Sequence, residues 1–269
     1  LEKVTSLDAV GRALRFIEGD QAQSIEDTVA LTLIEAPTFF EEARAKELCR
    51  RFEELGLQDV HLDEGGNAVG ILKGTTGGRL IMIEGHMDTV FPFGTVTEVR
   101  REGDILFAPG VGDDTRGCAI LLSVIRAFQN TGLRPEADLA FVGTTGEEGK
   151  GSMRGMKAFF ANNKVDASIS VDGDDVAGIT FNATGARTYE VNFYGRGGHA
   201  WAAFGTIANP LHAAARAVAK IADFVVPDDP KTTFSVSIFH AGNEAGIHSI
   251  VPKATIIFSF CSDLAELLQ

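Results

Sequence analysis

Four clusters of acidic and histidine side chains have the chemical types that divalent metal ions bind. They are His86 with Asp88, Asp113 with Asp114, Glu147 with Glu148, and Asp172. Mixed imidazole and carboxylate ligands suit Zn, Co or Mn better than Ca or Mg. The clusters therefore predict a transition-metal site, and their spacing does not choose between the three metals.

Three of the clusters follow short apolar runs, which are residues 79–84, 138–142 and 167–171. Runs of this length are typical of buried strands. In an open α/β sheet, ligands and metals bind where the carboxyl ends of parallel strands meet. We therefore expect the clusters to lie together at one edge of a sheet.

Glu147 and Glu148 form the most discriminating pair. They follow a buried strand and lie between Gly146 and Gly149, so a solvated helical face explains them poorly. One glutamate can coordinate a metal ion while its neighbour accepts a proton from metal-bound water, whose pKa is about 7 rather than 15.7. A glutamate base with such a nucleophile suits the hydrolysis of an amide.

His86, Asp88 and Asp113 have more than one interpretation. A histidine ligand usually donates its second ring N–H to a carboxylate, and Asp88 lies two residues after His86. Asp113 precedes a helix-like segment, where a carboxylate either bridges two cations or caps the helix. Both roles are compatible, because only one of Asp113 and Asp114 is needed as a cap.

Competing motifs fail on their spacing. The sequence GKGS (149–152) lacks the Ser or Thr directly after the lysine of a phosphate-binding loop. The sequence GVG (110–112) is not followed by the third glycine of a dinucleotide-binding loop. We also find no nucleophile-elbow motif for a Ser or Cys nucleophile.

The elements that position the clusters alternate between helix and strand patterns. We expect helices at 24–33, 41–55, 115–128 and 152–160, and strands at 60–62, 68–72, 80–84, 139–143 and 167–171. This alternation predicts an α/β class with a parallel or mixed central sheet. From residue 186 the pattern becomes β-α-β-β, with strands at 187–194, 233–239 and 254–260 and a helix at 211–224. That second region resembles a split β-α-β, α+β unit without its last strand.

Composition limits the partners and the compartment. A formal charge of −13 over 269 residues argues against nucleic acid and against an anionic membrane as partners. No apolar stretch reaches the roughly 18 residues that span a bilayer. The three cysteines are widely spaced and form no CxxC pattern, which indicates a reducing compartment, so we expect a cytoplasmic location.

Four sequence strings in order carry a resemblance to a known family. They are GHMDTVFP (85–92), APGVGDDTRG (108–117), TTGEEGKGSMRG (144–155) and SVDGDD (170–175). Together they resemble the aminoacylase/carboxypeptidase family of dinuclear zinc metallopeptidases, which includes acetylornithine deacetylase, succinyl-diaminopimelate desuccinylase, carboxypeptidase G and peptidase T. The spacing within GDDTRG favours the peptidase T-like branch.

The resemblance implies a role for each cluster. His86 and Asp172 would bind one metal ion, Glu148 would bind a second, and Asp113 would bridge them. Glu147 would be the general base, and Asp88 would orient His86. The two ions would be Zn, with Co or Mn as alternatives, and the Asp113–Asp114 peptide bond would be cis.

The resemblance also implies two domains. Residues 1–184 would form the N-terminal part of the catalytic domain, and residues 185–269 an inserted lid and dimerisation domain. His199, in GRGGHA (195–200), would reach the partner subunit's active site in a homodimer and polarise the scissile carbonyl. His248 stands where relatives have a substrate-binding Asn, and Cys261 where many have an Arg.

One part of the family pattern lies beyond the sequence. The family's last metal ligand is a histidine that follows the lid, whereas this chain ends at Gln269 inside the lid. We therefore expect that histidine, the last lid strand and the closing part of the catalytic sheet to be absent from this chain. The chain by itself should then hold one metal position weakly or not at all.

Two functions remain in view. The first is a metal-dependent hydrolase that cleaves an amide bond of a small peptide or N-acyl amino acid, with Glu147 as general base. The second is a non-catalytic or degenerate relative that kept the fold and acts as a binding module. A metal assay distinguishes them, because the enzyme requires two bound ions and the binding module requires none.

Overall fold

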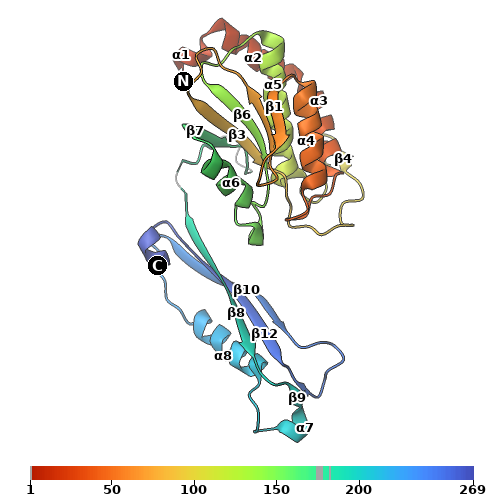
Figure 1. The fold of residues 1–269 in the computed structure, drawn as a ribbon, viewed down its shortest axis with the longest axis vertical. Helices are drawn as coiled ribbons and strands as arrows, with labels where there is room; N and C mark the ends of the chain where they lie inside the picture. The colour runs from red at the N-terminus through yellow and green to blue at the C-terminus, as the bar shows by residue number, and fades with distance from the viewer. Residues whose placement is uncertain (1, 174–177, 182) are drawn as a thin grey trace. The chain divides into compact units, whose positions relative to one another are not determined.

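The computed structural model describes residues 2–173, 178–181 and 183–269, and the chain divides into two compact units. Unit 1 is Leu1–Val176 and unit 2 is Ala177–Gln269 (Figure 1). The sequence analysis put the boundary after residue 184. The catalytic and lid roles of the two regions stay predictions.

Unit 1 is built on a five-stranded mixed sheet, counted over the described residues, in the order β1-β2-β6-β3-β7. The strands are β1 (Gln58–Leu62), β2 (Ala68–Leu72), β3 (Leu80–His86), β6 (Asp138–Thr144) and β7 (Ala167–Ser170). Strand β3 is parallel to β6 and β7, while β2 is antiparallel to β1 and β6. The predicted α/β class with a mixed sheet is therefore confirmed.

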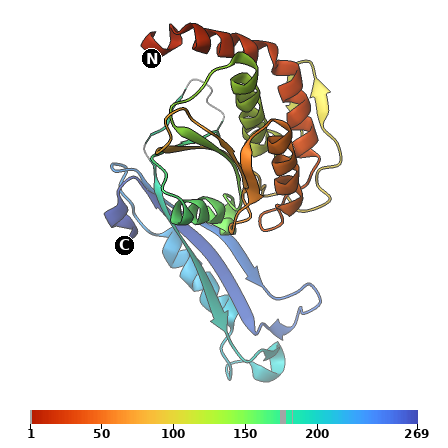
Figure 2. The ribbon, with the colours of Figure 1, turned by 45° about the horizontal axis from the view of Figure 1, so that its top comes forward.

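Helices cover both faces of this sheet (Figure 2). They are α1 (Glu2–Thr5), α2 (Asp8–Gly19), α3 (Gln21–Thr32), α4 (Glu42–Glu54), α5 (Arg116–Thr131) and α6 (Arg154–Asn162). On one face, Phe52 of α4 and Leu121 of α5 pack against Phe141 of β6. On the other face, Phe159 of α6 packs against Met82 of β3. The central strands are therefore buried on both sides, which explains their continuous apolar runs.

Helix α4 shows how the sequence sets these elements. Ala45, Leu48 and Phe52 recur at helical spacing and are fully buried against the sheet. The helix ends just before Gly56, whose φ of 76° is a left-handed conformation that favours glycine. The sequence analysis expected this helix at 41–55, close to its observed bounds.

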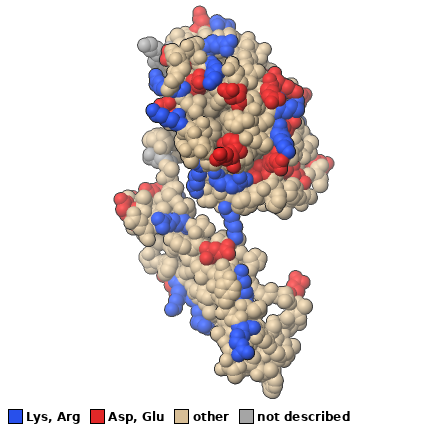
Figure 3. Space-filling model, in the orientation of Figure 1, with Lys and Arg blue, Asp and Glu red and all other residues tan. Residues whose placement is uncertain are grey.

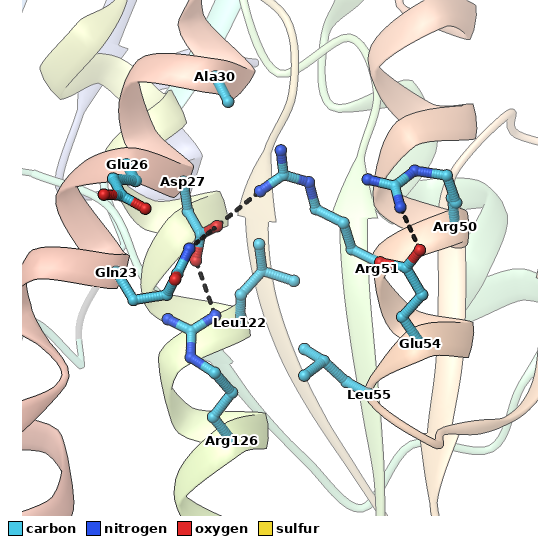
Figure 4. A pocket seen from close by; sticks show the side chains of 10 residues that line it. All are labelled: Gln23, Glu26, Asp27, Ala30, Arg50, Arg51, Glu54, Leu55, Leu122 and Arg126. Carbon is cyan, nitrogen blue, oxygen red and sulfur yellow. Dashed lines mark hydrogen bonds and ion pairs between the residues drawn. The ribbon is translucent and has the colours of Figure 1, made fainter.

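An ion-pair network joins α3, α4 and α5 on the outer side of the helical layer. Asp27 of α3 accepts hydrogen bonds from Arg51 of α4 and Arg126 of α5, each at 2.7 Å (Figure 4). Arg126 also binds Asp20, at the start of α3, at 2.6 Å. Asp27, Arg51 and Arg126 are among the residues that line a surface pocket of about 460 Å³. Because its charges are paired with one another, the network serves to connect the helices.

Several short or irregular elements were not predicted from the sequence. The helix α2 was missed, as was the hairpin of β4 (Arg100–Glu102) and β5 (Ile105–Phe107). Three-residue strands are too short to show a periodic pattern. The helix expected to begin at residue 152 begins at Arg154, because Ser152 and Met153 both have positive φ and form a turn after η2 (Gly149–Gly151).

Unit 2 contains a three-stranded antiparallel sheet in the order β10-β12-β8, covered by α8. These elements are β8 (Gly185–Tyr194), α8 (Pro210–Ala222), β10 (Thr232–Ala241) and β12 (Lys253–Ser262). The side chain of Asn209 caps α8 by accepting from the amide of Leu211 at 3.0 Å. Ala214 of α8 packs on Ala254 of β12, so small residues bring the helix close to the sheet. The predicted β-α-β-β pattern matches this order.

Shorter elements complete unit 2. They are β9 (Gly198–His199), α7 (Ala200–Ala203), β11 (Ser249–Ile250) and η3 (Ala265–Leu268).

Across the described part of the chain, every helix is too short or too polar to cross a membrane. Acidic and basic side chains are interspersed over the face of unit 1 that Figure 3 shows.

Candidate metal centre

The carboxyl ends of β3, β6 and β7 lie at the same edge of the sheet. In the parallel registers, His86 of β3 is opposite Thr144 of β6, and Glu84 of β3 is opposite Ser170 of β7. The residues that follow these ends are therefore brought together, as the sequence analysis expected. Asp174 and Asp175, the last two residues of the SVDGDD motif, lie outside the described residues.

Two overlapping groups of side chains at this edge have the geometry of metal ligands. In each group, one ligand atom from every residue lies within 4.8 Å of the others. The groups are His86, Asp113 and Asp172, and His86, Glu147 and Glu148. Because His86 belongs to both, the two groups adjoin each other. The structure thus brings together all four residues predicted as metal ligands, together with Glu147.

His86 is held so that its Nε2 atom faces the cluster. Nδ1 lies 3.0 Å from the backbone carbonyl oxygen of Asp88 and 3.6 Å from its carboxylate. Nε2 lies 2.8 Å from Oδ1 of Asp113. When Nδ1 carries the proton and donates it to this carbonyl, Nε2 is left as the ligand atom. Metal-binding histidines commonly donate their second ring N–H to such a partner.

The carboxylate of Asp88 makes its hydrogen bonds with the loop of the glutamate pair, whereas the resemblance gave it the role of orienting His86. This fully buried group accepts from the amide of Glu147 at 2.9 Å and from the amide of Glu148 at 3.1 Å. Its Oδ2 also accepts from the hydroxyl of Thr38 at 2.9 Å. Asp88 therefore supports the backbone of the glutamate pair, and its nearest contact with His86 runs through its own carbonyl.

Asp114 makes the contact with the helix start that was considered for the Asp113–Asp114 pair, and the bridging role of Asp113 stays a prediction. Their peptide bond is cis, as the resemblance implied. Asp114 is buried and accepts from the amide of Gly117, at the start of α5, at 2.9 Å and from the amide of His86 at 3.0 Å. It ties the helix to β3, whereas the exposed carboxylate of Asp113 faces His86.

The electrostatics of the site are those of crowded carboxylates around an imidazole. Burial raises the pKa of Glu147, and the charge of Asp172 raises it further. Burial and the charge of Asp113 raise the pKa of Glu148. Burial raises the pKa of Asp114 to about 8. Like charges held in a partly buried site destabilise one another, so this cluster favours a bound cation.

The residues fit divalent metal ions by the chemistry of the donor set. One imidazole and several carboxylates can supply nitrogen and oxygen ligands within the distances that a metal ion requires. Burial opposes the charged form of His86, but the hydrogen bond with Asp88 and the charges of Asp114 and Asp113 raise its pKa to about 10. In the metal-free chain the positive charge of the imidazolium is therefore paired with these carboxylates.

A small cavity lies beneath the cluster. It has a volume of about 40 Å³ and is lined in part by Glu84, Thr144, Ser170 and Asp172. Glu84 is buried, and its carboxylate accepts from the hydroxyl of Thr144 at 2.7 Å. Sequence reasoning missed Glu84, although a glutamate inside a buried apolar strand was a visible signal.

The two histidines predicted in unit 2 lie close together. The ring centroids of His199 and His248 are 6.3 Å apart, and the amide of Ala200 donates to the carbonyl of His248 at 2.8 Å. They line a surface pocket of about 500 Å³ with Ala200, Trp201 and Phe204. The side chains of Trp201 and Phe204 are 90% and 84% exposed, and the sequence analysis assigned neither of them a role.

Comparison with known proteins adds a family match. The profile of a family described as peptidase family M20/M25/M40 matches residues 82–264. This range includes every predicted metal ligand and both histidines of unit 2. Carboxypeptidase G2 from Pseudomonas sp. is 29% identical over 201 residues, which cover 72% of this chain and 46% of that protein. The chain thus spans about half the length of this curated relative.

Solved structures share the fold. A tripeptidase from Staphylococcus aureus superposes with a TM-score of 0.68 at 23% identity and covers 91% of this chain and 67% of its own. The di-peptidase Dug1p from Saccharomyces cerevisiae superposes with a TM-score of 0.71 at 15% identity over 96% of this chain and 74% of its own. At these identities the likeness concerns the fold.

Proposed function

The chain belongs to peptidase family M20/M25/M40, and from this premise we propose that it forms part of a hydrolase that cleaves an amide bond of a small peptide or N-acyl amino acid. One observation carries the proposal. His86, Asp113, Glu147, Glu148 and Asp172 converge at the carboxyl edge of the sheet. The alternative of a binding module has no observation in its favour.

The proposed site holds two divalent ions, of which Zn fits best and Co or Mn are alternatives. His86 and Asp172 would hold one ion, Glu148 the other, and Asp113 would bridge them. The group of His86, Asp113 and Asp172 supports the pairing of His86 with Asp172 on one ion. When bound, such ions supply Lewis acidity, which polarises a carbonyl oxygen and lowers the pKa of a coordinated water.

Glu147 is the proposed general base. Its pKa lies above the usual range of a glutamate because of burial and the charge of Asp172, which brings the carboxylate closer to the pKa that suits proton transfer near neutral pH. Glu147 would take a proton from the attacking water and pass it to the leaving amine. Asp88 fixes the backbone from which this side chain extends.

Unit 2 would provide substrate contacts in a homodimer. His199 would polarise the scissile carbonyl in the partner's site, and His248 would bind the substrate beside it. The 6.3 Å between their rings and their shared pocket support a joint role. The cytoplasmic location also stays a proposal, supported by three cysteines that are all free thiols.

The substitution Glu147→Gln tests the assignment of the base. Gln keeps the size of the side chain but cannot accept the proton, so we expect kcat to fall by about 100-fold or more. Two bound ions per chain should remain in the intact protein, measured by elemental analysis. Steady-state kinetics on di- and tripeptides and on N-acyl amino acids would give kcat and identify the substrate class.

Glu18→Gln is the matched control, because Glu18 is an exposed residue of α2 outside the cluster. It should leave kcat and metal content unchanged. Substantial turnover in Glu147→Gln would remove Glu147 from the role of base. An absence of bound metal in the unchanged protein would support the binding module instead.

A further inference from the structure

The loop that carries the glutamate pair is anchored at every amide from Thr145 to Glu148. Each of these four consecutive N–H groups donates to a side chain from another part of unit 1. The bonds are Thr145 to Asn67 at 3.0 Å, Gly146 to Glu41 at 3.0 Å, Glu147 to Asp88 at 2.9 Å, and Glu148 to Asp88 at 3.1 Å. Turns normally leave several amides to solvent, so this degree of anchoring indicates that the loop's position matters.

Glu41 is an anchor that neither the sequence motifs nor the proposed mechanism uses. It is 3% exposed, and its Oε1 accepts from the amides of Gly146 and Phe39 at 3.0 and 3.1 Å. Its Oε2 accepts from Nη2 of Arg154 at 2.6 Å. A buried carboxylate needs such a charged partner to remain ionised.

Arg154 connects this anchor to the loop a second time. Its Nη1 donates to the hydroxyl of Thr145 at 3.0 Å and to the carbonyl of Gly65 at 2.8 Å. The stem of Arg154 also packs against Gly146, where an added Cβ would come within 2.6 Å of it. The Glu41–Arg154 pair thus holds both the backbone and a side chain of the residues just before Glu147.

We propose that Glu41 and Arg154 are positioning residues that fix the loop 145–148 and so set the directions of the Glu147 and Glu148 carboxylates. The catalytic part of this inference rests on the proposed function, but the anchoring of the loop does not. A fixed loop keeps the base and the metal ligand at their working distances without rearrangement when substrate binds.

The test compares Glu41→Gln, Arg154→Met and Arg154→Lys with the unchanged protein. Glu41→Gln keeps the side-chain shape but removes the charge that pairs with Arg154. We expect the Zn²⁺ affinity, measured by chelator competition, to fall about 10- to 100-fold, as it does when residues that hold metal ligands in place are substituted. We expect kcat to fall by about 10- to 100-fold with KM nearly unchanged, because a misplaced base affects the chemical step.

Three results separate positioning from general stability. Arg154→Lys keeps a charge beside Glu41 but cannot reach all three of its acceptors, so it should recover part of the loss. The double variant Glu41→Gln/Arg154→Met should be no worse than the more severe single variant, because the two residues act as one unit. Hydrogen exchange at the amides of 145–148 should accelerate in the Glu41→Gln and Arg154→Met variants.

Arg126→Met is the matched control. Arg126 forms a similar buried ion pair, with Asp20 at 2.6 Å, in the helical layer (Figure 4 shows its second partner, Asp27). Its loss should lower the melting temperature and leave Zn²⁺ affinity, kcat and loop exchange unchanged. The proposal is overturned if Glu41→Gln and Arg154→Met behave like this control.

Failure of the proposed function gives a different result. In that case Glu147→Gln would retain turnover, or the unchanged protein would show none. The exchange of amides 145–148 would still report on the anchors. Unchanged exchange in Glu41→Gln, with activity lost in Glu147→Gln, would reject the positioning role alone.

Discussion

His86 supplies the imidazole of the proposed metal site, and its protonation links metal binding to pH. A metal ion binds the neutral imidazole, whereas the neighbouring carboxylates hold the pKa of His86 at about 10 in the metal-free chain. Metal binding near pH 7 must therefore displace a proton. The acidic residues that attract the cation also impose this competition.

We expect metal affinity to rise as the pH increases from 6 to 8. Both pH values lie below the pKa of about 10, so His86 is protonated throughout and loses about one proton on binding. One displaced proton corresponds to roughly a tenfold gain in affinity per pH unit. Calorimetry of Zn²⁺ binding in buffers of different ionisation enthalpy would count the protons released. An affinity that stays flat over this range would contradict the raised pKa.

Residue types identified the cluster from the sequence, but they did not identify its supports. His86, Asp113 and Glu148 have side chains that bind metals, and their places after apolar runs indicated a common edge. In the sequence, Glu41 and Arg154 look like ordinary charges of the helices expected at 41–55 and 152–160. Their role depends on a contact across 113 positions of the chain, which no local pattern contains.

At the scale of elements, buried strands were predictable and short irregular segments were not. Strands β3 and β6 show as apolar runs because both of their faces are covered. Helix α6 starts later than expected because two successive residues with positive φ precede it. That turn depends on the loop's tertiary contacts, so helix propensity alone could not locate it.

A substitution at Gly117, near the start of α5, tests how tightly this helix is held against the sheet. An added Cβ would lie 2.3 Å from both carboxylate oxygens of Asp114 and from the carbonyl of Val171. Asp114 is held by the amides of His86 and Gly117, so it cannot move aside freely. We expect Gly117→Ala to lower the free energy of unfolding by about 1–3 kcal/mol or more, measured by urea denaturation.

The same substitution at Gly11 is the control. Gly11 lies inside α2, where an added Cβ meets its closest atom at 3.5 Å. Gly11→Ala should raise the free energy of unfolding by up to about 1 kcal/mol, because alanine favours the helix. A neutral result at Gly117 would show that α5 is less tightly constrained at the sheet than the described contacts indicate.

At the scale of the whole molecule, the chain divides into two compact units, Leu1–Val176 and Ala177–Gln269. The local sequence pattern of unit 2 did not indicate its function. The two histidines and two aromatic side chains of this exposed pocket do not by themselves indicate a reaction in the sequence. Its proposed role depends on the resemblance and on a second copy of the protein, so it requires a test between subunits.

Co-expression of two inactive variants provides that test in the intact protein. If His199 serves the partner's site, a heterodimer of Glu147→Gln with His199→Ala has one site with both groups. Random pairing makes half of the dimers mixed, so activity should return to about a quarter of the unchanged protein. Glu147→Gln with Asp172→Asn is the control, because each site then lacks one essential group and no activity returns. Equal activity from the two mixtures would place the action of His199 outside the partner's site.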